Sequence, residues 1–542
     1  MVFKKMVRVQ PCSLGVHAQA SLLAVIVLVG AILRLWYLLA TEAMIESDEA
    51  IVGLQAFGIL RGEMPFFYPG QIFGSSFESY LVAGAIAMAG ASPWTLKVVP
   101  FIFSMLFILA SYWLGKEFYN PQLGLLSALF AALCPIPLLV LSLKAFGGYV
   151  ETPVLGNIIL ILLGRILYGG EKSASRFYLP VLLGMTCGFA FWVNPQSFYY
   201  LIPAGLLLLV SRNLRNMALF APAFALGTSP FFFGLFFAFS KDVALRQVSG
   251  GMVPLKDLWP SVKKAVSYFL TDTLPAIWGA RPPEGPFPTG PLLIAIPICA
   301  VALGFEVWRL WRNRREERAW ILGVTFLLSP FVFILGALNN GNFTAIIPDS
   351  GILNHYILPF YSFVLPLLAA SIWRLWVNRR RSGLALTVLI LGINLGGVMT
   401  TDMIEQTRSV FVNVPLPPSN RPLIEALEEE GIRHIYTFNW IGYVLIFETG
   451  ERILAFDYVD SLYGMDCLPQ YSQTVEKAQE APAYVLFNPR WKRPPPLEKR
   501  LKEMGVSFEK KALEDFIIYY NLSRRVHPSE VRETLVWPYY DK

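Results

Sequence analysis

Long apolar stretches, separated by short polar segments, occupy most of the first 400 or so residues. A helix needs about 20 predominantly apolar residues to cross the hydrocarbon layer of a membrane. The uncharged stretch from 177 to 211 is too long for one crossing, and Asn194-Pro195-Gln196 divides it into two short spans. The pattern predicts about eleven spans, near residues 20–40, 95–115, 121–141, 151–168, 177–193, 197–211, 217–239, 289–309, 319–338, 354–374 and 383–402.

The basic residues fall in every second loop between these spans. One set of loops carries runs such as those at 309–318 and 374–381. The opposite short loops, around Asn194 and from Asn339 to Asn354, contain no lysine or arginine. Because cytoplasmic loops are enriched in these residues, the pattern predicts a multi-pass protein of the cell membrane with a cytoplasmic N-terminus. An odd number of spans then places the C-terminus outside the cytoplasm.

Two of the predicted outer loops are long. The first, residues 41–94, contains two helix-like stretches, Asp48 to Arg61 and Phe77 to Gly90. We place the second stretch along the membrane surface, because counting it as a crossing would reverse the charge bias of every later loop. The second long loop, residues 241–288, ends in the sequence RPPEGPFPTG, which is compatible with a mobile lid or with a plain connector.

The composition changes after Arg408, which separates a membrane domain (residues 1–407) from a small outer α/β domain (residues 408–542). A helix is predicted from Arg421, with proline near its start and Gly431 just past its end. Strands are predicted at 432–438, 452–456, 483–487 and 516–520, with further helices ending at Phe447 and at 497–504. We find no phosphate-binding glycine loop in this domain.

Composition supports the membrane assignment. The chain is 55% hydrophobic and 15% charged, against roughly 25% charged residues in soluble proteins. The net charge of +7 does not indicate nucleic-acid binding, because the basic residues cluster between apolar runs. The five cysteines show no metal-ligand spacing and no obvious disulfide pair. Membrane lipids are therefore the expected surroundings, and no nucleic-acid partner is expected.

The first outer loop carries an acidic pair, Asp48 and Glu49, soon after the first span. A hydroxyl that attacks the anomeric carbon of a sugar loses its proton, and a carboxylate base contributes about 10²–10⁴-fold to such a step. Adjacent helical residues point about 100° apart, so one acid can face a cavity while its neighbour binds substrate or orients a partner. The structural alternative is equally strong, because Ser47 is a suitable N-cap and acids suit the first helical turn.

Several motifs, taken in order, resemble the GT-C glycosyltransferases. S-D-E-A after the first span, R-G-E-x-P and Y-P-G-Q-I-F-G-S-S-F-E-S-Y-L resemble the first outer loop of that family. N-H-Y-I-L-P-F-Y resembles its late R-Y-L-x-P-x-Y span, and N-W-I-G-Y-V-L-I-F-E-T-G resembles its outer domain. Protein O-mannosyltransferases and aminoarabinose-to-lipid-A transferases are the most similar members. The resemblance covers most of the chain and implies a mostly α fold, a GT-C transmembrane bundle with a small outer α/β domain.

The resemblance also implies inverting transfer of a sugar from a polyprenyl-phosphate carrier at the outer face, without a nucleotide. It makes Asp48 the base and places a second acidic residue after the third span, at Glu151 in K-A-F-G-G-Y-V-E. The sequence departs from the family at three points. Ile51 stands where the aminoarabinose enzymes have arginine, the run containing Glu78 replaces a Lys-Pro, and His355 replaces the arginine of R-Y-L.

The leaving lipid phosphate gains negative charge, so cations near it lower the barrier. Lys144, Arg61, Lys97 and His355 all lie on the predicted outer side, and Lys144 is the first choice. Tyr356, beside His355, is a further substrate-binding candidate. Two of these residues have a structural alternative: Lys144 as a snorkelling side chain and His355 as an interfacial histidine. Glu78 either binds acceptor hydroxyls or caps the surface helix, whereas Glu151 entering a span is costly without a role or a partner.

A divalent ion held by Asp48, Glu49 and Glu151 is chemically compatible with Mg²⁺ or Mn²⁺. The similar families do not require one, so we predict no metal and no other cofactor. The expected partners are a polyprenyl-phosphate-linked sugar and an acceptor protein, lipid or glycan.

Two other functions compete with the enzyme: a transporter or flippase for lipid-linked sugars, and a non-catalytic scaffold. Transporters tend to have internal repeats and charges near the midplane of the bilayer. Here we find no repeat, and charges cluster at the ends of the spans.

Overall fold

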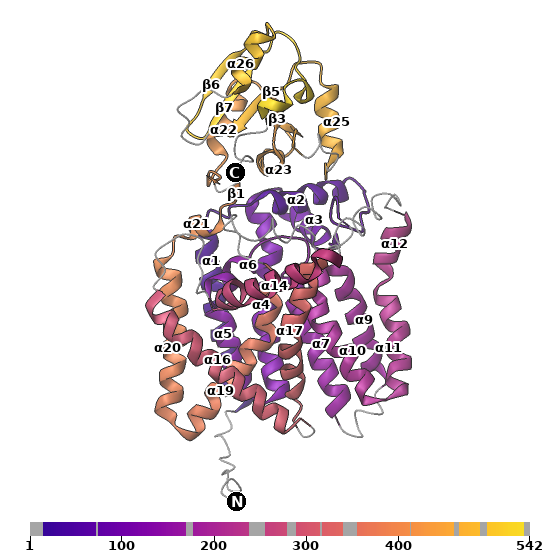
Figure 1. Cartoon of the computed structure of the whole chain (residues 1–542), viewed down its shortest axis with the longest axis vertical. Helices are drawn as coiled ribbons and strands as arrows, with labels where there is room; N and C mark the ends of the chain where they lie inside the picture. The colour runs from indigo at the N-terminus through magenta and orange to yellow at the C-terminus, as the bar shows by residue number, and fades with distance from the viewer. Residues whose placement is uncertain are drawn as a thin grey trace, which may run out of the picture.

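A helical bundle carries a small α/β domain at one end (Figure 1). This computed structural model describes residues 15–71, 74–169, 177–237, 255–278, 289–314, 317–339, 355–411, 414–459, 466–487 and 496–535. Two short helices of the first outer loop, α2 (Ser47–Leu60) and α3 (Phe77–Ala89), lie between the bundle and the α/β domain (Figure 1). The arrangement confirms the predicted fold class.

Six of the described helices are individually long and apolar enough to cross a membrane. They are α1 (Val16–Ala40), α4 (Pro93–Phe118), α7 (Glu151–Tyr168), α17 (Trp320–Asn339), α19 (Tyr361–Asn378, continuing η4, His355–Phe360) and α20 (Arg380–Thr400). Helices α11 (Leu214–Gly227) and α12 (Ser229–Phe237), bent by 41°, make a seventh if they are one broken span.

The other predicted spans correspond to helices that are shorter or only partly described in their side chains. They are α5 (Pro121–Ala132) with α6 (Ile136–Leu141), α9 (Tyr178–Val193), α10 (Phe198–Ser211, preceded by η1, Pro195–Ser197) and α16 (Thr289–Arg312). Each of the eleven predicted spans thus has a helical counterpart, and the chain is a multi-pass membrane protein. Its orientation in the membrane stays a prediction from the loop charges.

Local sequence signals set where several spans begin. Ser92 caps α4 by accepting a hydrogen bond from the Thr95 N–H at 3.1 Å. Asn120 caps α5 in the same way, because its Oδ1 accepts a hydrogen bond from the Leu123 N–H at 3.0 Å. Each cap is followed by proline, whose missing N–H costs nothing at the first helical position. Asn194 and the proline after it separate α9 from η1, which confirms the predicted break.

One predicted span, residues 121–141, is broken in the structure. Helix α5 ends at Ala132, and α6 begins after Pro135. The break frees carbonyl groups that have no water to bind inside a membrane. The fully buried Arg34 of α1 donates hydrogen bonds to two of them, Ala131 O at 3.0 Å and Ala132 O at 3.1 Å. A charged side chain inside a span therefore has a structural role here, which the hydropathy pattern did not indicate.

The long loop between α12 and α16 is described only in part. Its described segment forms η2 (Leu255–Asp257), α14 (Leu258–Tyr268), a π-helical turn at Phe269–Thr273 and α15 (Leu274–Ile277). Tyr361 of α19 donates a hydrogen bond to Ile277 O at 2.9 Å, which ties this segment to the bundle. The proline- and glycine-rich stretch at 279–288 lies outside the described residues, so its predicted role as lid or connector stays untested.

The C-terminal domain is built on a five-stranded sheet of order β4-β3-β5-β7-β6. The strands are β3 (His434–Thr437), β4 (Leu454–Asp457), β5 (Ala483–Phe487), β6 (Glu509–Ala512) and β7 (Phe516–Tyr520). The first three strands are parallel, whereas β7 pairs antiparallel with both β5 and β6. The helices are α22 (Arg421–Glu429), α23 (Asn439–Glu448), α25 (Pro469–Lys477), α26 (Pro496–Glu503), η5 (Pro528–Glu530) and α27 (Arg532–Leu535).

A short connection joins the bundle to this domain. It comprises α21 (Met403–Thr407) and a two-stranded sheet of β1 (Val410–Phe411) and β2 (Val414–Pro415). The predicted strands at 483–487 and 516–520 match the observed bounds, because both are fully buried and therefore apolar throughout.

The C-terminal domain docks on the first outer loop through the apolar helix α23. The rings of Phe447 on α23 and Phe57 on α2 stack with centroids 5.5 Å apart. A Cβ atom added at Gly53 would lie 2.3 Å from the Phe447 ring, so glycine is required for this approach. The N-terminal end of α2 also contacts the domain, where Ser47 Oγ donates to Asn439 O at 3.3 Å. Helix α2 is therefore held between the bundle and the outer domain.

Candidate active site

Glu46, and not the predicted Ser47, caps helix α2. Glu46 has an extended backbone, its side chain accepts from the N–H of Glu49, and its own N–H donates to Glu49 Oε2 at 3.3 Å. A carboxylate satisfies the free N–H groups of a helix start and suits its positive end. The prediction of a Ser47 cap was wrong because residue preference alone favoured serine. Ser47 is instead the first helical residue.

Asp48 lines a cavity of about 60 Å³ at the end of the bundle that carries the α/β domain. The other walls include Tyr68, Phe146, Tyr149 and Asn194. Desolvation by the surrounding protein, followed by repulsion from Glu46, raises the pKa of Asp48 to about 7, although the residue is exposed. Ligand sites usually measure about 300–1,000 Å³. The described residues therefore form only part of a site, and this cavity alone is too small to be a complete substrate pocket.

The two neighbouring acids are held by lysines. Glu49 forms an ion pair with Lys97 at 2.5 Å, and both side chains are almost completely buried. Glu46 pairs with Lys144 at 3.1 Å. Within the described residues, Asp48 is the member of this acidic trio that has no lysine or arginine partner. Of the predicted catalytic pair, Asp48 faces the cavity and Glu49 faces the protein interior.

Glu78 holds the loop at 142–150, which contributes part of the cavity wall. Its Oε2 accepts hydrogen bonds from the N–H groups of Gly147 at 2.6 Å and Gly148 at 3.2 Å. Both glycines have positive φ, 77° and 99°, which points their N–H groups toward one acceptor. The alternative that Glu78 caps α3 was wrong, since Ser76 occupies the N-cap position.

Three carboxylates of the first outer loop thus fasten the loop at residues 142–150. Their contacts are Glu46 to the Lys144 side chain, Glu49 to the Ala145 N–H at 2.9 Å, and Glu78 to the Gly147 and Gly148 N–H groups. The same loop contributes Phe146, Gly147 and Tyr149 to the cavity that Asp48 lines. These contacts tie the loop at 142–150 to the helices of the first outer loop, one of which carries Asp48.

Glu151 lies behind this wall, at the start of α7, and is fully buried. Neither of its carboxylate oxygens makes a hydrogen bond of normal geometry to the described residues. Burial and the nearby Glu151 raise the pKa of Glu78 well above its usual value, whereas the two glycine N–H groups oppose this shift. The structure thus brings Glu151 together with Glu78, and not into the lining of the Asp48 cavity.

The other predicted residues fall in different places. Tyr356 lies against Tyr149, where burial, Tyr356 and Asp48 together raise the pKa of the Tyr149 hydroxyl well above its usual value. The side chain of His355 lies outside the described residues. The structure does not bring Arg61 to the site: it pairs with Glu451 of the outer domain at 2.7 Å. Arg61 stands at the far end of α2, about 20 Å along the helix from Asp48.

Sequence reasoning missed the residues that complete the cavity. Tyr149 lies inside the quoted K-A-F-G-G-Y-V-E motif but was not singled out, and Asn194 was interpreted mainly as a helix break. Tyr68, which donates a hydrogen bond to the Asp48 carbonyl at 3.0 Å, opens the quoted Y-P-G-Q-I-F-G motif but was not singled out as a site residue. Among the described residues, no group of three or more His, Cys, Asp or Glu side chains is arranged to hold a metal ion.

Comparisons with known proteins identify the fold. No family model matches the chain, and no curated protein matches it by sequence. ArnT from Cupriavidus metallidurans, solved bound to undecaprenyl phosphate, aligns with a TM-score of 0.60 and 13% identity over 93% of this chain and 99% of ArnT. Its apo structure aligns with a TM-score of 0.59 and 13% identity over 93% and 98%.

A second protein aligns less closely. It is the archaeal oligosaccharyltransferase AglB from Archaeoglobus fulgidus, in complex with an inhibitory peptide and a dolichol-phosphate. AglB has 12% identity over 86% of this chain and 69% of its own, with a TM-score of 0.48. The ArnT alignments carry the conclusion: this chain has the ArnT fold, and the predicted GT-C resemblance is confirmed at the level of the fold.

Proposed function

We propose that this protein is an inverting glycosyltransferase, which moves a sugar from a polyprenyl-phosphate carrier to an acceptor hydroxyl at the outer membrane face. One observation carries the proposal: Asp48 lines a cavity without an ion-pair partner in the described structure, while the acids on either side are paired. The bound undecaprenyl phosphate of ArnT, which has the same fold, supports the class of donor.

In the proposed reaction, the Asp48 carboxylate takes the proton of the acceptor hydroxyl as its oxygen attacks the anomeric carbon. The bond from that carbon to the carrier phosphate breaks, and its electron pair goes to the phosphate oxygen. Lys144, close enough to lower the pKa of Asp48, is the nearby cation that offsets the charge growing on the phosphate. Glu49 acts as a positioning residue, because it holds Lys97 and the loop at 142–150.

Tyr149 and Tyr356 are the proposed hydrogen-bonding groups for sugar or phosphate. Protein, lipid and glycan hydroxyls are all candidates for the acceptor. The test is mass spectrometry of surface glycans and polyprenyl-phosphate sugars in cells with and without the protein. A transferase makes a new glycosidic bond and accumulates free carrier phosphate. A flippase would instead change where the lipid-linked sugar lies without forming a product, and that result would reject the proposal.

The rate of transfer should depend on pH through Asp48. Its pKa is raised to about 7, and the base works only when it is ionised. The rate should therefore be constant above this value and fall about tenfold per pH unit well below it. A pH profile of initial rates with purified protein measures the midpoint. A flat profile down to pH 5 would contradict the assignment of Asp48 as the base.

Exhaustive chelation should leave the rate unchanged. Glu49 is already occupied by Lys97 and the Ala145 N–H, so it is a poor ligand for a divalent ion shared with Asp48. The measurement compares rates before and after dialysis against a strong chelator. Activity that is abolished and then restored by Mn²⁺ would show that the site uses a metal.

A further inference from the structure

A second cavity, of about 490 Å³, lies at the end of the bundle opposite the outer domain. Helix α4 ends and α5 begins on one side of it, and α17 begins and α19 ends on the other. Its polar wall contains the two arginines Arg318 and Arg374, one acid, Glu317, and the uncharged Tyr119, Asn120, Trp373 and Asn378. The volume falls within the range of about 300–1,000 Å³ that is typical of small-molecule sites. This cavity has no part in the proposed sugar transfer.

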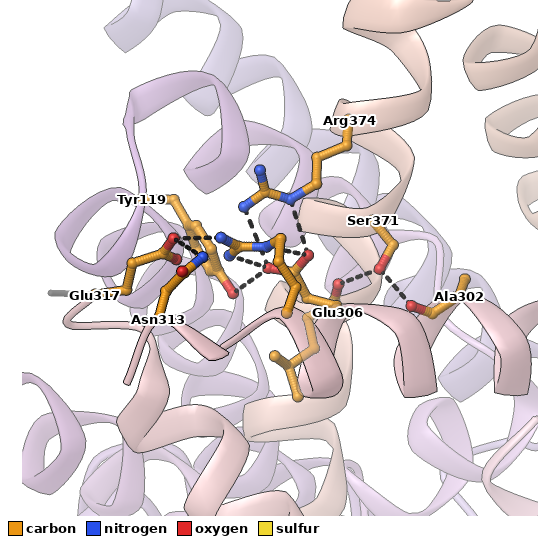
Figure 2. Close-up of polar contacts among 9 residues, drawn as sticks. Tyr119, Ala302, Glu306, Asn313, Glu317, Ser371 and Arg374 are labelled. Carbon is orange, nitrogen blue, oxygen red and sulfur yellow. Dashed lines mark hydrogen bonds and ion pairs between the residues drawn. The ribbon is translucent and has the colours of Figure 1, made fainter. Parts of the chain in front are cut away.

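A buried carboxylate holds one wall of the cavity in place (Figure 2). Glu306 of α16 is fully buried and pairs with Arg309 at 2.7 Å and with Arg374 of α19 at 2.9 Å. Tyr119 donates a hydrogen bond to the same carboxylate at 3.3 Å. Figure 2 shows Arg374 and Tyr119 both directed at Glu306. The guanidinium group of Arg374 is therefore fixed before any ligand arrives.

The ion-pair network around the cavity has an excess of positive charge. The salt bridges form two clusters, Glu117 with Arg165 and Arg318, and Glu306 and Glu317 with Arg309 and Arg374, which together hold three acids and four arginines. The difference, four minus three, leaves one positive charge. Water screens that charge less here than at an open surface, so the cavity favours an anion.

Both arginines of the cavity wall keep N–H groups for a ligand. Arg374 uses Nε and Nη2 on Glu306, which leaves Nη1 without a partner among the described residues. Arg318 uses Nη1 on Glu117 and Nη2 on Tyr168 O, which leaves Nε. The two side chains remain 32% and 28% exposed. Guanidinium groups placed in this way recognise phosphate oxygens by charge and geometry.

We propose that this cavity binds the phosphate headgroup of an anionic phospholipid in the cytoplasmic leaflet. The wall continues into the apolar side chains of Phe118, Leu123 and Val377, which suit an acyl chain and not a free ion. The positive-inside pattern of the loops places this end of the bundle at the cytoplasmic surface. Basic pockets between membrane helices on that side bind acidic lipid headgroups in other proteins.

The test is native mass spectrometry of the full-length protein in detergent, titrated with phosphatidylglycerol or phosphatidylcholine. Saturable binding of phosphatidylglycerol is expected, and Arg318→Gln should weaken it about tenfold or more, because a charge-assisted hydrogen bond is lost. Arg318→Gln leaves Glu117 paired with Arg165, so the fold is preserved. The double variant Glu306→Gln with Arg374→Gln removes the buried carboxylate together with its arginine partner and should weaken binding similarly.

Arg312→Gln is the matched control. Arg312 lies at the same end of the bundle, is exposed and packs on Trp308, but it does not line the cavity. It should weaken binding less than about threefold, as expected of a charge outside the pocket. Equal binding of the two lipids, or equal effects of Arg312→Gln and Arg318→Gln, would overturn the proposal. Displacement of the lipid by millimolar inorganic phosphate would show a free-phosphate site and overturn the lipid assignment.

Discussion

Replacing Asp48 by asparagine is expected to lower the rate of sugar transfer by about 10²–10⁴-fold, the usual contribution of a general base. Asparagine keeps the size of the side chain and can still accept hydrogen bonds, but it cannot take a proton. The loss should appear in kcat, because the hydroxyl is deprotonated during the chemical step and not on binding. Initial rates with a polyprenyl-phosphate sugar measure the effect.

Glu42→Gln provides the control for this experiment. Glu42 lies in the same outer loop, is exposed and loses the same charge on substitution, but it does not line the Asp48 cavity. Its rate should stay within about threefold of the parent protein, as expected for a site outside the reaction centre. Normal membrane insertion of Asp48→Asn with an unchanged rate would refute Asp48 as the base.

The second large effect concerns stability. Lys97→Met is expected to destabilise the protein by about 3–5 kcal/mol, because it leaves Glu49 as a buried charge without its partner. Both side chains of this pair are almost completely buried, so water cannot compensate the loss. Thermal unfolding of the purified protein in detergent, followed by tryptophan fluorescence, measures the change.

Two further variants separate this effect from a general sensitivity to mutation. Combining Lys97→Met with Glu49→Gln removes the unpaired charge and should recover a large part of the lost stability. Arg61→Gln breaks the exposed pair with Glu451 and should cost no more than about 1 kcal/mol. A Lys97→Met protein as stable as its parent would show that the buried pair contributes nothing to folding.

The sequence predicted those features of the fold that depend on local signals. The break at Asn194 follows from the proline after it. The strands at 483–487 and 516–520 follow from their continuous apolar runs. The break at Pro135 escaped prediction because the apolar run continues through it. The broken helix is stabilised by the hydrogen bond from Arg34 to the Ala132 carbonyl. The two residues are 98 positions apart in the chain, so no local sequence pattern predicts this contact.

The candidate site was predictable to a smaller extent. The acidic residues could be named from the loop, but their division into free and paired groups depends on distant partners. Lys97 is 48 residues from Glu49, and Gly147 is 69 residues from Glu78. Arg61 was placed with the site because of its charge and side of the membrane, whereas the direction of α2 carries it to the outer domain. The partner of each charged residue is therefore determined by three-dimensional packing and not by residue type.

The docking of α23 on α2 has a consequence for biosynthesis. Ser47 and its contact Asn439 are 392 residues apart in the chain. At roughly 5–20 residues per second, a ribosome needs about 20–80 s to make the intervening polypeptide. During that interval the helix that carries Asp48 has already emerged but lacks the cover provided by Phe447. The helix that carries Asp48 should therefore reach its final packing only late in translation, after α23 has been made, however fast the membrane helices insert.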